Sequence, residues 1–345
     1  MEAMQSRLGK LTRTLSRLVP AAFARPFGRP TALFFHGVEP CTDDERVQTN
    51  HHEIDEFVQI VRIIKEQFQV LPLAALGDAL SRPERHARTV FLMSDDGYAN
   101  TLSFAADILD EVHLPWTLFV STHHVDTQER NPIFLVRLFY YYAPPGRYEI
   151  PNFEPVVLGD IKQRGRQVGP AIDRLRLMEF AAATRAVSAM LEAFADDSLR
   201  RLLARFVSES FLSWPQIASL KKRGVEIGAH AHHHWAMHAG QPQAYFQDQA
   251  RQSRARIIKE IGECRAFAYP FGNTADVSRS AWEAVRDAGY EYAFTTLSGT
   301  LDASLNRYLL PRFCLDRREP SLASLVPLLR GANPRLAGWQ RKIAR

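Results

Sequence analysis

Seven short apolar runs alternate along the chain with stretches of helical periodicity. The runs are rich in β-branched and aromatic residues and too short for helices, so each predicts a buried strand. They cover residues 31–35, 69–73, 89–93, 116–120, 225–229, 266–270 and 292–296. Apolar residues recur at helical spacing over residues 53–66, 99–112, 215–223, 244–262 and 277–288. This alternation predicts an α/β fold with a mainly parallel sheet covered by helices, either a barrel or a doubly wound sheet.

One long interval, from about residue 126 to residue 212, interrupts the alternation. It contains the apolar and aromatic stretch FLVRLFYYYAPPG, then a charged region, then further helical patterns. The simplest interpretation is a helical subdomain inserted between two strands of the sheet. The chain then divides into an N-terminal arm (1–30), a core domain (31–330) with its insertion at 126–212, and a C-terminal tail (331–345).

Charge is concentrated at the two ends of the chain. The formal net charge is +5, yet residues 1–30 hold six basic residues against one acidic residue, and residues 331–345 hold four basic residues and no acidic one. The body of the chain is therefore mildly acidic. A nucleic-acid-binding protein is expected to carry a basic face on its folded body, so no nucleic-acid partner is predicted.

The N-terminal arm has the pattern of a basic amphipathic helix, with leucines at positions 8, 11, 15 and 18. Such a helix either packs on the domain or lies on an anionic membrane surface, and both interpretations stay open. The chain has no stretch typical of a secretory signal or a transmembrane helix. Three widely spaced cysteines argue against a disulfide framework. We expect a cytoplasmic protein, with peripheral membrane contact through residues 1–30 as one possibility.

Polar or glycine-containing turns follow four of the predicted strands directly. They are His36-Gly37, Ser94-Asp95-Asp96-Gly97, the histidine-rich stretch from His230 to His238, and Phe271-Gly272. The carboxyl ends of parallel strands share one edge of a sheet, so these turns are expected to lie together.

The two aspartates and the histidines together suggest a hydrolytic metal site, although each motif alone is commonly a plain turn or a solvated loop. His230 and His234 are four residues apart, which would place both imidazoles on one side of a helical turn. One carboxylate and two imidazoles leave positions open for water on a zinc-type ion. The other carboxylate of the pair is then a natural general base.

In this order and spacing, Asp95-Asp96-Gly97, His230-x3-His234 and Tyr269-Pro270-Phe271-Gly272 resemble the motifs of the polysaccharide deacetylases, the NodB-like domain of carbohydrate esterase family 4. The resemblance runs from about residue 31 to residue 316, interrupted by the insertion. It implies a distorted (β/α) barrel of mainly parallel strands. It also implies a divalent metal, usually Zn²⁺ with Co²⁺, Ni²⁺ or Mn²⁺ as alternatives, and removal of N-acetyl, less often O-acetyl, groups from sugars.

Carried over to matching positions, the resemblance assigns roles to individual residues. Asp96, His230 and His234 would be the metal ligands, which leaves the other three histidines of the cluster as bystanders. Asp95 would be the general base for the attacking water, and the backbone N–H near Phe271 would stabilise the oxyanion. One branch of the family has a rearranged motif order with its general-acid histidine on the first strand, and His36 matches that feature. Three residues that adjoin these motifs are expected to contact the substrate: Tyr98, Tyr269 and Pro270.

Two departures from the family pattern affect these assignments. Ala231 stands where Ser or Thr is usual, so a hydroxyl that would orient the loop is missing. Ala268 stands where an arginine usually tunes the catalytic aspartate. Without a cationic neighbour, burial would raise the pKa of Asp95. We therefore predict that Arg312, which follows the last predicted strand, supplies the missing charge.

Two other classes of function use the same features. A two-histidine, one-carboxylate ligand set also suits an Fe(II) oxygenase, but those sites are usually built on a different, all-β architecture. A non-catalytic carbohydrate-binding protein on a degenerate deacetylase barrel would account for the two alanines, while retention of both aspartates and both histidines favours an enzyme. The expected substrate is an acetylated amino sugar in a polysaccharide or glycolipid precursor, for which the basic arm suggests a lipid-linked or nucleotide-linked form.

Overall fold

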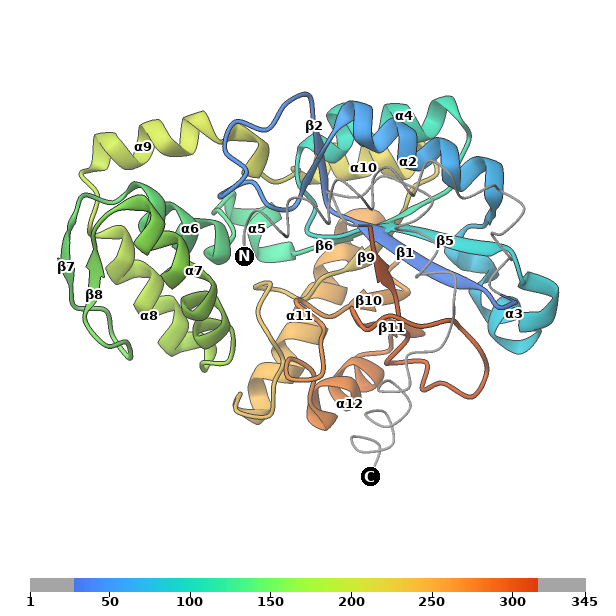
Figure 1. The fold of residues 1–345 in the computed structure, drawn as a ribbon. Coiled ribbons are helices and arrows are strands. Elements are labelled where there is room, and N and C mark those ends of the chain that lie inside the picture. The colour runs from blue at the N-terminus through green and yellow to red at the C-terminus, as the bar shows by residue number, and fades with distance from the viewer. Residues whose placement is uncertain (1–27, 316–345) are drawn as a thin grey trace.

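A curved parallel sheet runs through the larger part of the molecule in the computed structural model, which describes residues 28–315 (Figure 1). Its strands follow the order β11-β10-β9-β6-β5-β1-β12, with β4 pairing on β5. The strands are β1 Thr31–Phe35, β4 Gln69–Val70, β5 Thr89–Ser94, β6 Thr117–Val120, β9 Glu226–Ala229, β10 Ala266–Ala268, β11 Tyr292–Phe294 and β12 Phe313–Cys314. The N-terminal arm up to residue 27, with the membrane contact predicted for it, and the C-terminal tail lie outside the described residues.

The strands along this path follow the order of the chain, from β1 through β5, β6, β9, β10 and β11 to β12 beside β1. All of their pairings are parallel. A parallel bridge between Phe294 and Leu310 adds a contact at the side where β11 and the segment before β12 meet. The distorted (β/α) barrel is therefore confirmed.

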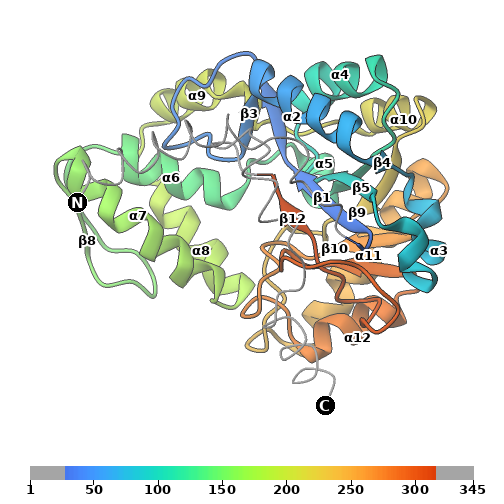
Figure 2. The ribbon, with the colours of Figure 1, turned by 45° about the vertical axis from the view of Figure 1, so that its right-hand side comes forward.

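Helices cover the outside of the sheet, as the alternating pattern predicts (Figures 1 and 2). They are α2 Ile54–Gln67, α3 Leu76–Ser81, α4 Ala106–Glu111, α5 Thr122–Thr127, α10 Trp214–Lys222, α11 Gln243–Ile261 and α12 Arg279–Asp287. The stretch Thr101–Ala105 before α4 is a π-helix. One predicted strand needs correction, because the run at 69–73 forms only the two-residue strand β4. Three further strands were not predicted, since they are too short to give a periodic signal: β2 Gly37–Glu39, β3 His51–Glu53 and β12.

Residues 132–205, between α5 and α10, form a second body beside the barrel (Figure 2). Its helices are α6 Pro132–Tyr142, α7 Ile161–Arg176, α8 Phe180–Leu191 and α9 Asp196–Arg205. It is not wholly helical, because β7 Gly146–Tyr148 and β8 Val156–Leu158 form an antiparallel pair. A hydrophobic cluster of its own holds it together, including Phe134, Phe139, Leu175, Met190 and Phe206, and the barrel contributes Trp235 to that cluster.

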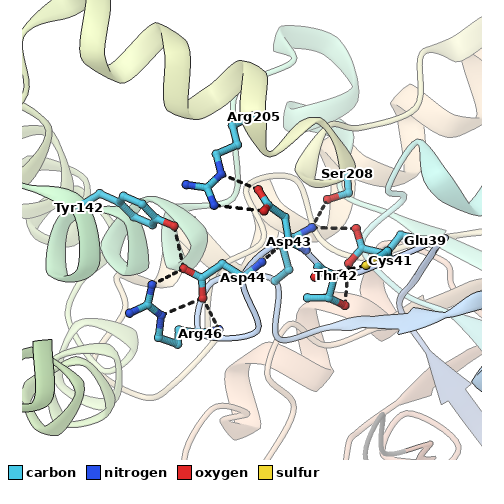
Figure 3. A network of polar contacts seen from close by, with 10 residues as sticks. Glu39, Cys41, Thr42, Asp43, Asp44, Arg46, Tyr142, Arg205 and Ser208 are labelled. Carbon is cyan, nitrogen blue, oxygen red and sulfur yellow. Dashed lines mark hydrogen bonds and ion pairs between the residues drawn. The ribbon is translucent and has the colours of Figure 1, made fainter.

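A network of polar contacts ties the loop after β2 to this inserted segment (Figure 3). Arg205 donates to both carboxylate oxygens of Asp43 at 2.5 and 3.1 Å, and the Tyr142 hydroxyl donates to Asp44 at 2.7 Å. Nearer the barrel, the Gln48 amide donates to the Ser208 hydroxyl at 2.8 Å. The loop and the insertion are therefore held as one wall beside the carboxyl end of the sheet. Within residues 28–315, no helix has both the length and the apolar character needed to cross a bilayer.

Candidate active site

A cavity of about 270 Å³ opens at the carboxyl end of the sheet. This volume is close to the lower end of the range for small-molecule sites, roughly 300–1,000 Å³. On the barrel side it is lined by residues that follow strands, namely His36, Asp95, Asp96, Tyr98, His230, His234, Tyr269, Phe271 and Thr296. On the other side it is lined by Asn131, Ile133, Phe134, Arg137, Ile172 and Glu209, which belong to the inserted segment. The four polar strand ends therefore converge, as the parallel sheet requires.

Asp96, His230 and His234 form a buried group whose ligand atoms lie within 4.8 Å of one another. Asp96 Oδ1 is 2.8 Å from His234 Nε2 and 3.2 Å from His230 Nε2. Neither contact has hydrogen-bond geometry, so this buried oxygen has no hydrogen-bond partner among residues 28–315. One carboxylate oxygen and two imidazole nitrogens that converge in this way fit a zinc-type ion with open positions.

The two imidazoles are oriented by groups behind them. His230 Nδ1 lies 2.8 Å from the Ala268 carbonyl, and His234 Nδ1 lies 3.3 Å from the Asn131 side chain. Burial raises the pKa of Asp96, but the charge of His234 and the contacts with both histidines outweigh it and hold that pKa well below its usual range. Asp96 is thus an anion in the folded protein, as a metal ligand must be.

The backbone around these ligands is left-handed at several non-glycine residues. Asp96, Ala231, His234 and Phe271 have φ of 74°, 58°, 51° and 60°. Such conformations cost of order 1–3 kcal/mol each and cluster at functional sites. The expectation of a helical turn from His230 to His234 is wrong, because this stretch is an irregular loop in which Ala231 and His234 reverse the chain. The two rings meet through that loop geometry, with centroids 4.8 Å apart.

The hydroxyl that Ala231 lacks is replaced by other contacts on the same loop. Gln249 on α11 accepts hydrogen bonds from the backbone N–H groups of His232 and His233 at 3.1 and 2.8 Å. The Ser121 hydroxyl donates to the His232 carbonyl at 3.0 Å. Nothing in the local sequence marks Gln249 or Ser121, since both reach the loop only through the fold.

Arg312 lies directly against Asp95. Its Nη1 and Nη2 donate to the two carboxylate oxygens at 2.7 Å each, and its Nε donates to the Thr295 carbonyl at 3.0 Å. Burial raises the pKa of Asp95, but the Arg312 charge, followed by that of His230, lowers it below the usual range. The structure therefore brings a guanidinium to the aspartate from a position far along the chain, while Ala268 fills the place where the family pattern has an arginine.

His36 follows β1 and lines the same cavity. Burial lowers its pKa, while the negative charges of Asp96 and Asp95 act in the opposite direction. Its backbone carbonyl accepts a hydrogen bond from Ser94 at 2.9 Å, which ties the ends of β1 and β5 together.

The residues expected to contact substrate differ in how far they reach the cavity. Phe271 lines it, and its backbone N–H has no hydrogen-bond partner among residues 28–315. Tyr98 also lines it, and burial, followed by the charge of Asp96, raises its pKa. Tyr269 lies in the cavity wall but is fully buried and donates its hydroxyl to the Tyr308 carbonyl at 3.0 Å. Pro270 is buried and lies outside the lining.

His232 and His233 gather with His123 in a second, half-buried group away from the cavity lining. The ring nitrogens already contact neighbouring side chains, with distances of 3.0 Å from His123 to Glu129, 2.7 Å from His232 to Thr122 and 2.9 Å from His233 to Gln249. His238 contacts the Met178 carbonyl at 3.0 Å. These contacts give the three remaining histidines of the cluster places in the packing of the loop.

Comparison with known proteins gives a family match for part of the chain. Residues 176–293 match the family model described as polysaccharide deacetylase, a range that includes His230 and His234. No curated protein sequence matches the chain.

Several solved structures share the fold at low sequence identity. The Streptococcus pyogenes deacetylase PplD, in complex with acetate, is 15% identical and has a TM-score of 0.58, over 88% of this chain and 98% of that one. A de-N-acetylase from Aggregatibacter actinomycetemcomitans is 14% identical with a TM-score of 0.53, over 87% and 99% of the two chains. IcaB from Ammonifex degensii is 15% identical with a TM-score of 0.53, over 90% and 97%.

Part of the chain, residues 176–293, thus matches the polysaccharide deacetylase family model, and the chain shares the fold of the solved structures above.

Four residues of the cavity region have no signal in the sequence. Asn131, Arg137 and Glu209 come from the inserted segment, and His51 lies behind Glu209 with its Nε2 2.9 Å from Glu209 Oε1. Their motifs are not distinctive, and only the docking of the insertion against the barrel brings them to the site.

Proposed function

We propose that this protein is a metal-dependent deacetylase that hydrolyses the N-acetyl group of an amino sugar in a polysaccharide or glycolipid precursor. The observation that carries this proposal is the buried convergence of Asp96, His230 and His234 beside the Asp95–Arg312 pair in one cavity. Two of the solved proteins of this fold also support the proposal, since one is described as a de-N-acetylase and the other as a deacetylase in complex with acetate.

Asp96, His230 and His234 would hold a divalent ion, with zinc as our first choice from the mixed oxygen and nitrogen donors. When bound, the ion polarises the acetyl carbonyl and lowers the pKa of water at its open positions. The protein supplies the anionic ligand and the two oriented imidazoles, all three of them buried side chains.

Asp95 is placed to act as the general base. Arg312 keeps it ionised, so it can accept a proton from the water that attacks the acetyl carbon. A carboxylate with a lowered pKa is a weak base, which suits a water that is already easy to deprotonate. The free backbone N–H of Phe271 donates to the carbonyl oxygen as negative charge develops on it.

His36 is our candidate for the general acid. Attack of water on the acetyl carbon gives a tetrahedral intermediate. When this intermediate collapses, the carbon–nitrogen bond breaks, acetate is released, and the leaving amine takes a proton. Because burial lowers the pKa of His36, it must gain that proton during turnover. The proton that Asp95 takes from the attacking water would supply it, and the charges of the two aspartates favour the protonated imidazole. Tyr98 and the ring of Phe271 line the space where the sugar would lie.

The proposal is tested by acetate release from a panel of N-acetylated amino sugars, with the metal-reconstituted wild type and the Asp95→Asn variant. We expect the wild type to release acetate and the variant to lose about 10²- to 10⁴-fold in kcat, the usual contribution of a general base. Metal uptake is measured on the same samples, since Asp95→Asn should still bind the ion. A wild type that binds metal yet releases no acetate from any substrate would contradict the proposal and favour a carbohydrate-binding protein.

A further inference from the structure

The insertion side of the cavity carries a positive charge that the deacetylation chemistry does not use. We propose that Arg137 binds an anionic group of the substrate, so that the enzyme acts on an acetylated sugar that bears a phosphate or a carboxylate. This inference rests on the proposed function, which it extends by naming the substrate class.

Arg137 belongs to α6, and it lines the cavity together with Ile133 and Phe134 of the same helix. Residues three and four apart share one face of a helix, so this face of α6 is the one turned to the site. Ile172 of α7 lines the cavity beside them. An apolar surface with one guanidinium fits a sugar ring that carries a charged substituent.

The guanidinium of Arg137 has no carboxylate partner. Within the described part of the chain it forms no ion pair within 4.0 Å, and its hydrogen bond is to the Arg46 carbonyl at 3.3 Å. Two other arginines nearby in the fold are different: Arg46 lies 2.6 Å from Asp44, and Arg205 lies 2.5 Å from Asp43. Arg46 and Arg205 are therefore each paired with a loop aspartate, whereas Arg137, which lines the cavity, is not.

Glu209 is the carboxylate of the wall that could compensate Arg137, but it is already engaged. Its Oε1 lies 2.9 Å from His51 Nε2, and both side chains are buried. Arg130, one residue before the N-cap of α6, adds a second guanidinium whose buried Nε has no hydrogen-bond partner among residues 28–315. Burial lowers the pKa of Arg137 and of Arg130, and the Glu209 charge opposes this at both. The carboxylate nearest to hand is thus occupied by His51, and Arg137 lines the cavity without an ion-pair partner of its own among residues 28–315.

An arginine in this setting recognises a planar or tetrahedral oxyanion through paired N–H donors. The anionic group that we infer belongs on the acetylated sugar or on the bond that follows it, because Arg137 lines the same cavity as the candidate metal ligands. A phosphate ester and a uronic-acid carboxylate share this chemistry, and the experiment separates them.

The test compares kcat/KM for acetate release from matched acetylated sugars that differ only in one substituent: neutral, phosphomonoester, phosphodiester and carboxylate. We expect the wild type to prefer at least one charged member by about tenfold or more, as for a charge-assisted contact that the neutral analogue lacks. The arm that shows the preference identifies the group. Arg137→Gln should abolish that preference, chiefly through KM, and Arg137→Lys should restore part of it.

Arg147→Gln is the matched control, since Arg147 is exposed on β7, pairs with Glu149 and lies outside the cavity lining. It should keep the wild-type preference. A wild type that processes neutral and charged substrates equally would overturn the inference while leaving the deacetylase proposal in place, and this comparison needs no variant to fold. A preference that survives in Arg137→Gln would also overturn it. Failure to release acetate from every member of the panel would instead refute the proposed function.

Discussion

The pair formed by Arg312 and Asp95 gives the sharpest test of how this site is built. Arg312 has no exposed side-chain surface and Asp95 has 2%. The guanidinium makes two hydrogen bonds of 2.7 Å to the carboxylate and lies 4.2 Å from the centre of the Phe34 ring. Arg312→Met keeps an apolar stem of similar length but leaves the Asp95 carboxylate buried without its cation.

We expect Arg312→Met to lower the free energy of unfolding by about 3–5 kcal/mol, the usual cost of removing one partner of a buried ion pair. Most of that cost is the stranded charge, so Asp95→Asn in the same chain should recover part of it. In a double-mutant cycle measured by urea unfolding, the two effects should fall short of additivity by about 2–3 kcal/mol.

The same variant tests the catalytic role of the pair. Arg312 lowers the pKa of Asp95 and burial raises it, so without the arginine the carboxyl group ionises only at higher pH. The acid limb of the kcat/KM profile should therefore move to higher pH in Arg312→Met, and less so in Arg312→Lys, which retains a charge. Additive stability effects with an unchanged acid limb would refute the reasoning.

Two further predictions concern packing and pH. A Cβ at Gly228 on β9 would lie 2.5 Å from the Phe119 ring, so Gly228→Ala should lower the free energy of unfolding by about 1–3 kcal/mol. A Cβ at Gly165 in α7 would have its nearest neighbour at 3.7 Å, so Gly165→Ala should raise that free energy by up to about 1 kcal/mol. Equal effects of the two variants in urea unfolding would contradict this prediction. Burial lowers the pKa of His51, but the Glu209 charge outweighs it and leaves that pKa above its usual value. The stabilisation from this pair should then be complete below pH about 6.5 and be lost as pH rises through the raised pKa. The difference in the free energy of unfolding between wild type and His51→Gln should therefore be large at pH 6 and small at pH 9. A difference that does not change with pH would contradict the role of the pair.

The prediction of Arg312 shows how far reasoning from residues can reach. Ala268 marks a missing cation, and a buried carboxylate needs one, so the sequence points to a substitute near the last strand. The pairing with Asp95 follows from the barrel order, because β12 lies beside β1 and β1 lies beside β5. The tuning role of Arg312 stays a prediction until the pH profile is measured.

The loop from His230 to His234 shows where such reasoning stops. The four-residue spacing correctly singled out two histidines that converge, but for the wrong reason, since the chain there is not helical. Left-handed backbone at Ala231 and His234, with Gln249 holding the loop from α11, brings the rings together. These are contacts between distant segments, and no local pattern encodes them.

The sequence by itself determined the longer strands of the main sheet, their parallel arrangement and the polar residues at their ends, because hydrophobic periodicity is a local property that survives the tertiary context. It also determined that Asp95, Asp96, His230 and His234 would share one edge of a sheet, since the ends of parallel strands meet there. Only the tertiary structure decided what faces that edge. The inserted segment folds around its own hydrophobic cluster and brings Arg137 to the cavity, and this depends on packing between surfaces that are far apart in the chain.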